Sequence, residues 1–254
     1  QHQRIYGSAE TELLQNTLNI SRMALAKMAI SNSLFLNINH TKRAGMMALQ
    51  ILDGVLHHRG VVEPPLFFNL ILATLISHVG IVGGILEEDE VKPNQPAEKY
   101  YTGKGEYKSF VGPSSNSVLW PHYIERSLLF VDRNFRSLKN LNIEDVKSAI
   151  KFSDISSKST AKEQTNFCHY VRSAHILAYM TQSQYNQWLV RLYRSLEEAN
   201  LLDHLGFDHL GKFRENYSQH FWETFYSDLT HLIPLLRETE EGKMLLATLY
   251  SRMS

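Results

Sequence analysis

The sequence contains a single cysteine, Cys168, among its 254 residues. One thiol cannot form a disulfide within the chain, and the same count excludes zinc-finger sites built from several cysteines. A chain so poor in cysteine fits a reducing compartment, so we expect an intracellular protein, either cytoplasmic or organellar, with the mitochondrion among the candidates. Cys168 and its neighbour His169 do not indicate a thiol enzyme, because adjacent residues on a helix point about 100° apart.

The chain also lacks an excess of charge of either sign, with 26 lysine and arginine residues against 26 aspartate and glutamate residues. Without a basic excess, no long-range field attracts nucleic acid or an anionic membrane surface. We therefore expect no nucleic-acid partner. The pattern GxxxxGK[ST] is absent as well, which excludes nucleotide binding of the P-loop kind.

Long runs without charge are rare in this chain, and the longest covers residues 64–86 with His78 near its middle. Its length alone would allow a transmembrane helix, which needs about 20 apolar residues. However, polar residues interrupt the run, and the glycines at 80, 83 and 84 favour a helix end shortly after His78. We therefore expect a buried core helix over about 66–78 and no transmembrane segment.

No convincing alternation of apolar and polar residues, the pattern of a strand, occurs anywhere in the chain, whereas helical periodicity recurs throughout. The sequence predicts an all-α protein, a single domain of about nine or ten helices. Residues 87–117 contain an acidic run followed by glycines, prolines and serines, and they predict a long loop that is either a lid or a simple surface excursion. Besides 66–78, the expected helices cover about 10–30, 39–56, 121–136, 143–152, 161–181, 184–199, 213–226, 228–236 and 239–252.

Histidine is abundant, with 12 residues in the chain. Neutral imidazole is the commonest ligand of transition metals, and helices can direct ligands inward from distant positions in the sequence. His40, His78, His122 and His175 all lie in apolar helical contexts. Each is a candidate metal ligand, and each is also a candidate hydrogen-bonded core or surface histidine.

The order of several motifs resembles the bacterial HD-domain metal-dependent phosphohydrolases, which are distant relatives of the cyclic-nucleotide phosphodiesterases. The likeness extends over about residues 30–254 and implies a helical bundle of that type, preceded by an N-terminal helical extension at 1–30. In that family, helices gather histidines and aspartates around one or two divalent metals that activate water for attack on a phosphate ester. The matching motifs are His40-Thr41, His78 with the glycines after it, Thr102 to Glu106, Leu119 to Arg126, Arg172 to His175, and Phe213 to Tyr217.

The chain departs from the family at the metal ligands. His40 matches the first ligand, but Leu36 stands where the family tends to have a histidine. His78 matches the histidine of the His-Asp pair, yet Val79 follows it and the aspartate is missing. His175 replaces the later aspartate of the family. His122 is shifted by one position relative to a family histidine, which turns it about 100° around a helix.

These departures favour a degenerate HD-domain protein that has lost hydrolase activity and serves as a structural or interaction subunit of a larger assembly, with protein partners and no cofactor. One alternative is an active phosphohydrolase or phosphodiesterase with an altered ligand set. In that case His40, His78 and His175 would hold one divalent ion (Zn, Mn, Mg or Fe), and Asp89 or Glu87 could supply the missing carboxylate. A further alternative is a regulatory module that binds a nucleotide or phosphate ligand through Arg126 and Arg172. Arginines at such helix positions are also common structural ion-pair partners.

Overall fold

The computed structural model describes residues 1–91, 97–111, 114–136, 138, 142–155 and 166–253. Helices dominate it, as the sequence predicts, and the all-α class is confirmed. The helices of the first part of the chain are α1 (His2–Tyr6), α2 (Thr11–Met28), α3 (Ile38–Arg59), α4 (Pro64–Ile76), α5 (Tyr123–Phe135), α6 (Ile143–Phe152) and α7 (Asn166–Met180), with short 3₁₀ turns η1 (Val79–Ile81) and η2 (Asn116–His122).

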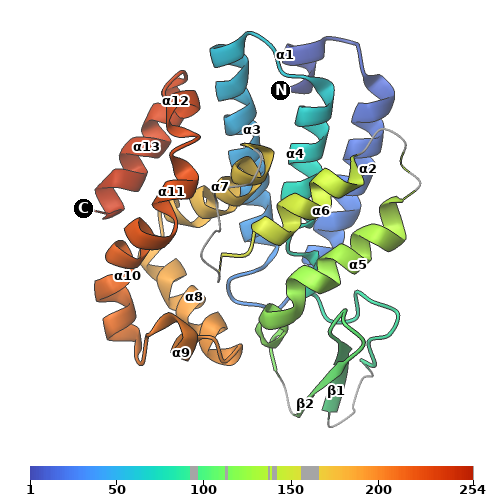
Figure 1. Ribbon diagram of the computed structural model, residues 1–254, viewed down its shortest axis with the longest axis vertical. Coiled ribbons are helices and arrows are strands. Elements are labelled where there is room, and N and C mark those ends of the chain that lie inside the picture. Colours follow the sequence, from blue (N-terminus) through green and yellow to red (C-terminus); the bar gives the residue numbers. More distant parts are fainter. Residues whose placement is uncertain (92–96, 112–113, 137, 139–141, 156–165, 254) are drawn as a thin grey trace.

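The second part of the chain continues as helices that lie beside the first part. Helix α7 runs between the two groups and contacts α3, α4 and α6 on one side and α8, α11 and α13 on the other (Figure 1). The expected segment 228–236 is two short helices rather than one. The helices of this part are α8 (Tyr185–Glu198), α9 (Leu202–Leu205), α10 (Leu210–Thr224), α11 (Tyr226–Leu229), α12 (Ile233–Leu236) and α13 (Glu240–Met253).

Helix α3 begins and ends at residues that stabilise helix termini. Its N-cap, Asn37, accepts hydrogen bonds through its side chain from the backbone N–H groups of Asn39 and His40. Its C-cap, Gly60, has φ of 75°, a conformation that glycine adopts without steric cost. These caps fix the register of α3 and therefore the inward direction of His40.

Helix α4 is the core helix that the apolar run predicts. Two prolines occupy its first turn, where their missing N–H groups cost nothing. It belongs to the one window of the described chain that is long and apolar enough to span a membrane, Pro64–Ile81, and 78% of that window is buried by the surrounding helices. The helix ends at Ile76, and the chain turns through η1 directly after His78.

The expectation that the chain contains no strand is wrong for a small part of the segment 87–117. Strands β1 (Ala97–Tyr101) and β2 (Tyr107–Val111) form an antiparallel hairpin with Tyr101 opposite Tyr107. Gly103 and Gly105, both with positive φ, make the turn between them. The hairpin shows no clear strand pattern in the sequence, because each strand is only five residues long and rich in aromatic and charged residues. It lies at one end of the molecule, beside α5 (Figure 1).

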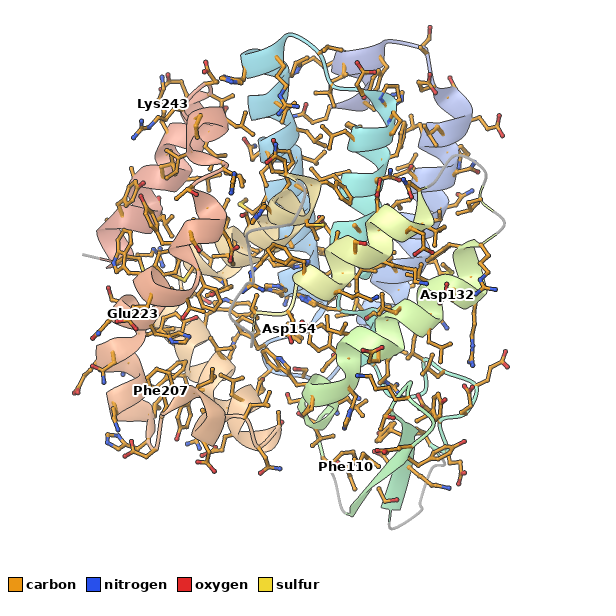
Figure 2. The ribbon with its side chains drawn as sticks, in the orientation of Figure 1. Phe110, Asp132, Asp154, Phe207, Glu223 and Lys243 are labelled. Atoms are coloured by element: carbon orange, nitrogen blue, oxygen red, sulfur yellow. The ribbon has the colours of Figure 1, made fainter. Side chains whose placement is uncertain are left out.

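The N-terminal residues 1–30 pack onto the rest of the chain. Helix α2 contacts α3 and α4 and contributes Ala24 and Met28, both fully buried, to the common core. Side chains fill the space between the two groups of helices, and Asp154, which follows α6, lies near the middle of the view in Figure 2.

Candidate functional site

Three of the predicted histidines meet in the interior. His40 comes from the first turn of α3, His78 from the turn between α4 and η1, and His175 from α7. Their exposed fractions are 0%, 1% and 0%. We call these three residues the histidine triad. It is the one group of metal-ligating side chains found among the described residues whose candidate ligand atoms all lie within 4.8 Å of one another.

The rings of the triad are in contact. His40 Nε2 lies 3.3 Å from His175 Nδ1, and these two rings stack with an interplanar angle of 15°. The ring centroids of His78 and His175 are 4.1 Å apart, and those of His40 and His78 are 5.3 Å apart. Aromatic side chains surround the cluster, with Phe35 beside His40 and Tyr123 beside His78.

Most ring nitrogens of the triad lack a hydrogen-bond partner. Both nitrogens of His78, Nδ1 of His40 and Nε2 of His175 are buried without a partner among the described residues. A buried polar atom left in this state costs about 1–3 kcal/mol. The site therefore contains more nitrogen lone pairs and N–H groups than the protein satisfies, as expected where a ligand supplies the missing contacts.

Burial also keeps the three imidazoles neutral. It lowers the pKa of His40 to about 3, with a smaller contribution from the charge of Arg43. Burial is also the main cause that lowers the pKa of His78 and of His175. A neutral imidazole offers a lone pair, which is the form that a metal ion binds.

No carboxylate of the described residues joins the triad. Glu87 is exposed on the surface, and Asp89 forms a completely buried ion pair with Arg126. The hypothesis that Asp89 or Glu87 supplies a missing ligand is therefore not supported by their positions. Asp89 is instead a structural residue that fastens the segment before the hairpin to α5.

Both arginines proposed as phosphate contacts have internal partners. Arg126 donates to both carboxylate oxygens of Asp89 at 2.8 Å and to the carbonyls of Gly80, Val82 and Tyr101. The N–H groups of its guanidinium are therefore engaged by partners inside the protein. The geometry thus favours the structural ion-pair role for Arg126 over a role in ligand binding.

Arg172 belongs to a second buried cluster that the sequence does not reveal. Its Nε donates to Asp228 Oδ2 at 2.7 Å, and its Nη1 donates to the carbonyls of Phe152 and Asp154. His169 Nδ1 lies 3.5 Å from Asp228 Oδ1. This cluster joins α7 to α11 and to the end of α6, and Asp228 lies 56 positions from Arg172 in the sequence.

The comparisons with known proteins place the chain in one family. A family model described as Npun_R2479-like matches residues 1–254. The chain belongs to the Npun_R2479-like family. No curated protein and no solved structure matches it. Since the description of the Npun_R2479-like family names no activity, the function has to be argued from the site.

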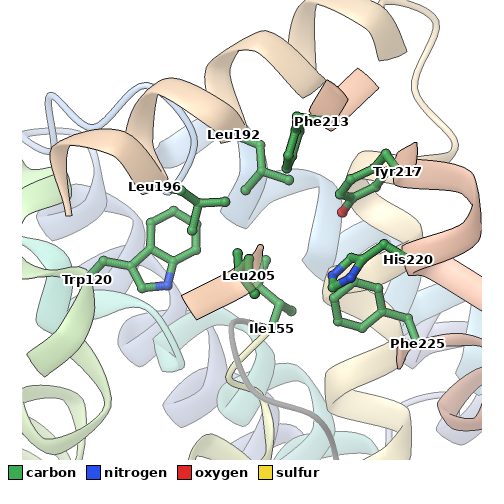
Figure 3. Close-up of a pocket in the computed structure, with 9 residues that line it drawn as sticks. All are labelled: Trp120, Ile155, Leu192, Leu196, Leu205, Phe213, Tyr217, His220 and Phe225. Carbon is green, nitrogen blue, oxygen red and sulfur yellow. The ribbon is translucent and has the colours of Figure 1, made fainter. Parts of the chain in front are cut away.

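In this Npun_R2479-like protein, a small cavity lies near the triad and is separated from it by the aromatic rings of Phe35 and Trp120. Trp120 in its wall stacks on Phe35, which in turn contacts His40. Its volume of about 20 Å³ is enough for one water molecule and far too little for a phosphate ester. Figure 3 shows the residues that line it, which are mostly aliphatic and aromatic: Trp120, Ile155, Leu192, Leu196, Leu205, Phe213, Tyr217, His220 and Phe225.

His122, the fourth candidate ligand, is half-buried at the end of η2 and is not part of the triad. His57 and His58 lie in the last turn of α3 and are exposed. The sequence therefore identified the three residues that meet, while their packing into one cluster without a carboxylate became visible only in three dimensions.

Proposed function

We propose that this protein is a degenerate relative of the HD-domain phosphohydrolases that binds a single divalent transition-metal ion at His40, His78 and His175 and has no hydrolase activity. In this proposal it acts as a structural or interaction subunit of a larger assembly. The observation that carries the proposal is a buried cluster of three neutral imidazoles in which one nitrogen of His40 faces one of His175 and both nitrogens of His78 are unpaired. No carboxylate of the described residues takes part in it.

The donor set fits one transition-metal ion. Imidazole nitrogens suit Zn²⁺ and similar ions, whereas Mg²⁺ and Ca²⁺ prefer oxygen ligands. Two nitrogens bound at about 2.0–2.1 Å to a tetrahedral ion lie roughly 3.3 Å apart, and His40 Nε2 and His175 Nδ1 are already separated by 3.3 Å. A bound ion would link α3, α4 and α7, the helices from which the ligands come.

Two features argue against hydrolysis. A pair of metal ions that activates water is held by carboxylates, which also balance its charge, and none joins the triad among the described residues. In addition, the three side chains are at most 1% exposed, so a phosphate ester has no contact with them in this conformation.

The interaction role is supported by apolar side chains on the surface and by a groove that some of them line. Ile30, Met46 and Met244 are 66%, 61% and 70% exposed. Met244 lines a shallow groove between α3 and α13. Single exposed apolar side chains are common on protein surfaces, whereas a groove lined by several of them, here also Met47 and Leu245, is typical of a surface that contacts another protein.

The proposal is tested by loading the purified protein with Zn²⁺, removing excess metal, and measuring bound metal by mass spectrometry together with hydrolysis of bis(p-nitrophenyl) phosphate and p-nitrophenyl phosphate. We expect one ion per chain, loss of that ion in His78→Ala, and no turnover. His58→Ala, an exposed histidine outside the triad, is the matched control and should keep the ion. Turnover that is abolished by His78→Ala would establish the hydrolase alternative instead.

A further inference from the structure

A second potential binding site lies on the surface, in a cleft of about 470 Å³ between α8, α10 and α13. Its volume is within the range of pockets that bind small molecules, about 300–1,000 Å³. Polar side chains form most of its wall, and they include two arginines, Arg214 from α10 and Arg252 from α13. None of the residues of the histidine triad lines it.

The two arginines of the cleft have no carboxylate partner within the described parts of the chain. No ion pair shorter than 4.0 Å joins either guanidinium to an acidic side chain there, although Glu215 also lines the cleft. The guanidinium of Arg252 lies over the ring of Tyr185, 5.2 Å from its centroid. Stacking of this kind orients a guanidinium and leaves the N–H groups at its edge free to donate.

The side chains that line the cleft carry a net positive charge. The pKa of Arg43, in α3, is lowered mainly by burial and additionally by the charge of Arg252, so Arg43 lies close to Arg252. Two arginines and one glutamate in the wall leave a net charge of +1, and Arg43 adds to it. An accumulation of like charge costs free energy in the empty state, and a bound anion would relieve that cost.

The start of helix α8 strengthens the same electrostatic preference. Tyr185 and Asn186, the first two residues of this 14-residue helix, line the cleft. The N-cap residue Gln184 makes no side-chain capping hydrogen bond. The N–H groups of a first helical turn favour an anion when no cap satisfies them.

We propose that this cleft binds the phosphate group of a small phosphorylated molecule. Arg214 and Arg252 would donate charge-assisted hydrogen bonds to the phosphate oxygens, and Asn186 would add a neutral donor. Ser218 instead helps to form the wall, because its hydroxyl donates to the carbonyl of Met253 at 2.7 Å. The ring of Tyr185 and the buried side chain of Leu189 supply apolar surface for the remainder of the ligand.

This site is independent of the metal proposal. It also differs from a phosphate site at Arg126 and Arg172, whose guanidiniums are occupied inside the fold, because the arginines of the cleft reach solvent. A concave cleft of this size suits a small ligand, and the balanced net charge of the chain provides no basic surface for nucleic acid.

The proposal is tested by isothermal titration calorimetry and ³¹P NMR at low ionic strength, with inorganic phosphate and AMP as probes. We expect saturable binding of both, weakened about tenfold or more by Arg214→Gln and by Arg252→Gln. Glu215→Gln should tighten binding, because it removes the one negative charge in the wall. Arg214→Lys keeps the charge without the planar fork and should bind with intermediate affinity.

The matched control is Arg194→Gln, which removes an exposed arginine of α8, one of the helices around the cleft, at a position that does not line it. It should leave the affinity for both probes within twofold of the wild type. The proposal is overturned if neither probe binds at millimolar concentration, or if Arg194→Gln weakens binding as much as Arg214→Gln does. Metal content and thermal melting of every variant are measured in parallel, so that a failure of this site is distinguishable from a failure of the triad.

Discussion

Buried Arg126 shows how one residue can look functional in the sequence and be structural in the fold. Its guanidinium donates hydrogen bonds to both carboxylate oxygens of Asp89 and to backbone carbonyls of η1 and β1. The side chains of Arg126 and Asp89 are both completely buried. The pair therefore joins three elements, α5, η1 and the hairpin. A buried pair with this many hydrogen bonds becomes costly when one member is removed, because the other is left charged without a partner.

Asp89→Asn should reduce the free energy of unfolding by about 3–5 kcal/mol, measured by urea denaturation at pH 7. The matched control is Glu88→Gln, which breaks the more exposed pair of Glu88 with Arg133 and should cost at most about 1 kcal/mol. Equal effects of the two substitutions would contradict the structural role of the buried pair.

The triad makes the stability of the metal-free protein dependent on pH. The pKa of His40 is about 3 in the fold and about 6.5 in an unfolded chain, so the unfolded state binds more protons between these values. The pKa values of His78 and His175 are lowered in the same direction. Stability contributed by a group with a lowered pKa is fully present above pH 6.5 and is lost as the pH falls toward 3.

For chelator-treated protein, we expect the free energy of unfolding to fall below pH 6.5 by up to about 1.4 kcal/mol per pH unit for each histidine of the triad. Urea denaturation at a series of pH values measures this slope. His40→Leu should reduce the slope, while His58→Leu at the exposed end of α3 should leave it unchanged. A slope that is the same in His40→Leu and wild type would contradict the neutral state of His40.

Close approach of η1 to α5 is what places His78 in the interior. Gly80 N donates to Ser127 Oγ at 2.8 Å, and Ser127 Oγ donates to the carbonyl of Ser77 at 2.9 Å. A Cβ on Gly80 would lie 2.1 Å from the carbonyl oxygen of Tyr123 and 2.5 Å from Ser127 N. Only glycine therefore fits between the end of α4 and the backbone of α5.

Gly80→Ala should destabilise the fold by at least about 1–3 kcal/mol, because backbone atoms that cannot move aside meet the added methyl group. It should also weaken metal binding, since η1 begins directly after His78. Gly45→Ala in α3 is the control: its Cβ would meet only the flexible end of Leu75 at 3.0 Å, and a helical alanine is favoured over glycine by about 0.5–1 kcal/mol. A stable Gly80→Ala variant with full metal content would show that η1 is free to shift.

At the scale of elements, the longer helices could be predicted because their apolar residues recur at helical spacing, and proline and glycine mark the ends of α4. The short helices α1 and α9 were not predicted. The hairpin could not be predicted, because two strands of five residues do not show a sustained alternation. The ion pair of Arg172 could not be predicted either, because its partner Asp228 lies 56 positions away and no local pattern in the sequence joins the two residues.

For the whole molecule, the gathering of His40, His78 and His175 was predicted from a resemblance, whereas the pattern of each helix alone left both roles open for every histidine, metal ligand or hydrogen-bonded core or surface residue. The structure brings together α3, α4 and α7, which belong to one contiguous core. The cleft with Arg214 and Arg252 was not foreseen, because its residues come from three helices of the last third of the chain and form no motif in the sequence.

The most direct measurement is a crystal structure of the zinc-loaded protein with anomalous diffraction recorded above and below the zinc absorption edge. We expect one anomalous peak, about 2.0–2.1 Å from one nitrogen of each of His40, His78 and His175. Two metal peaks bridged by a carboxylate, or no peak at the triad, would contradict the single-ion site from which the proposed loss of hydrolase activity follows.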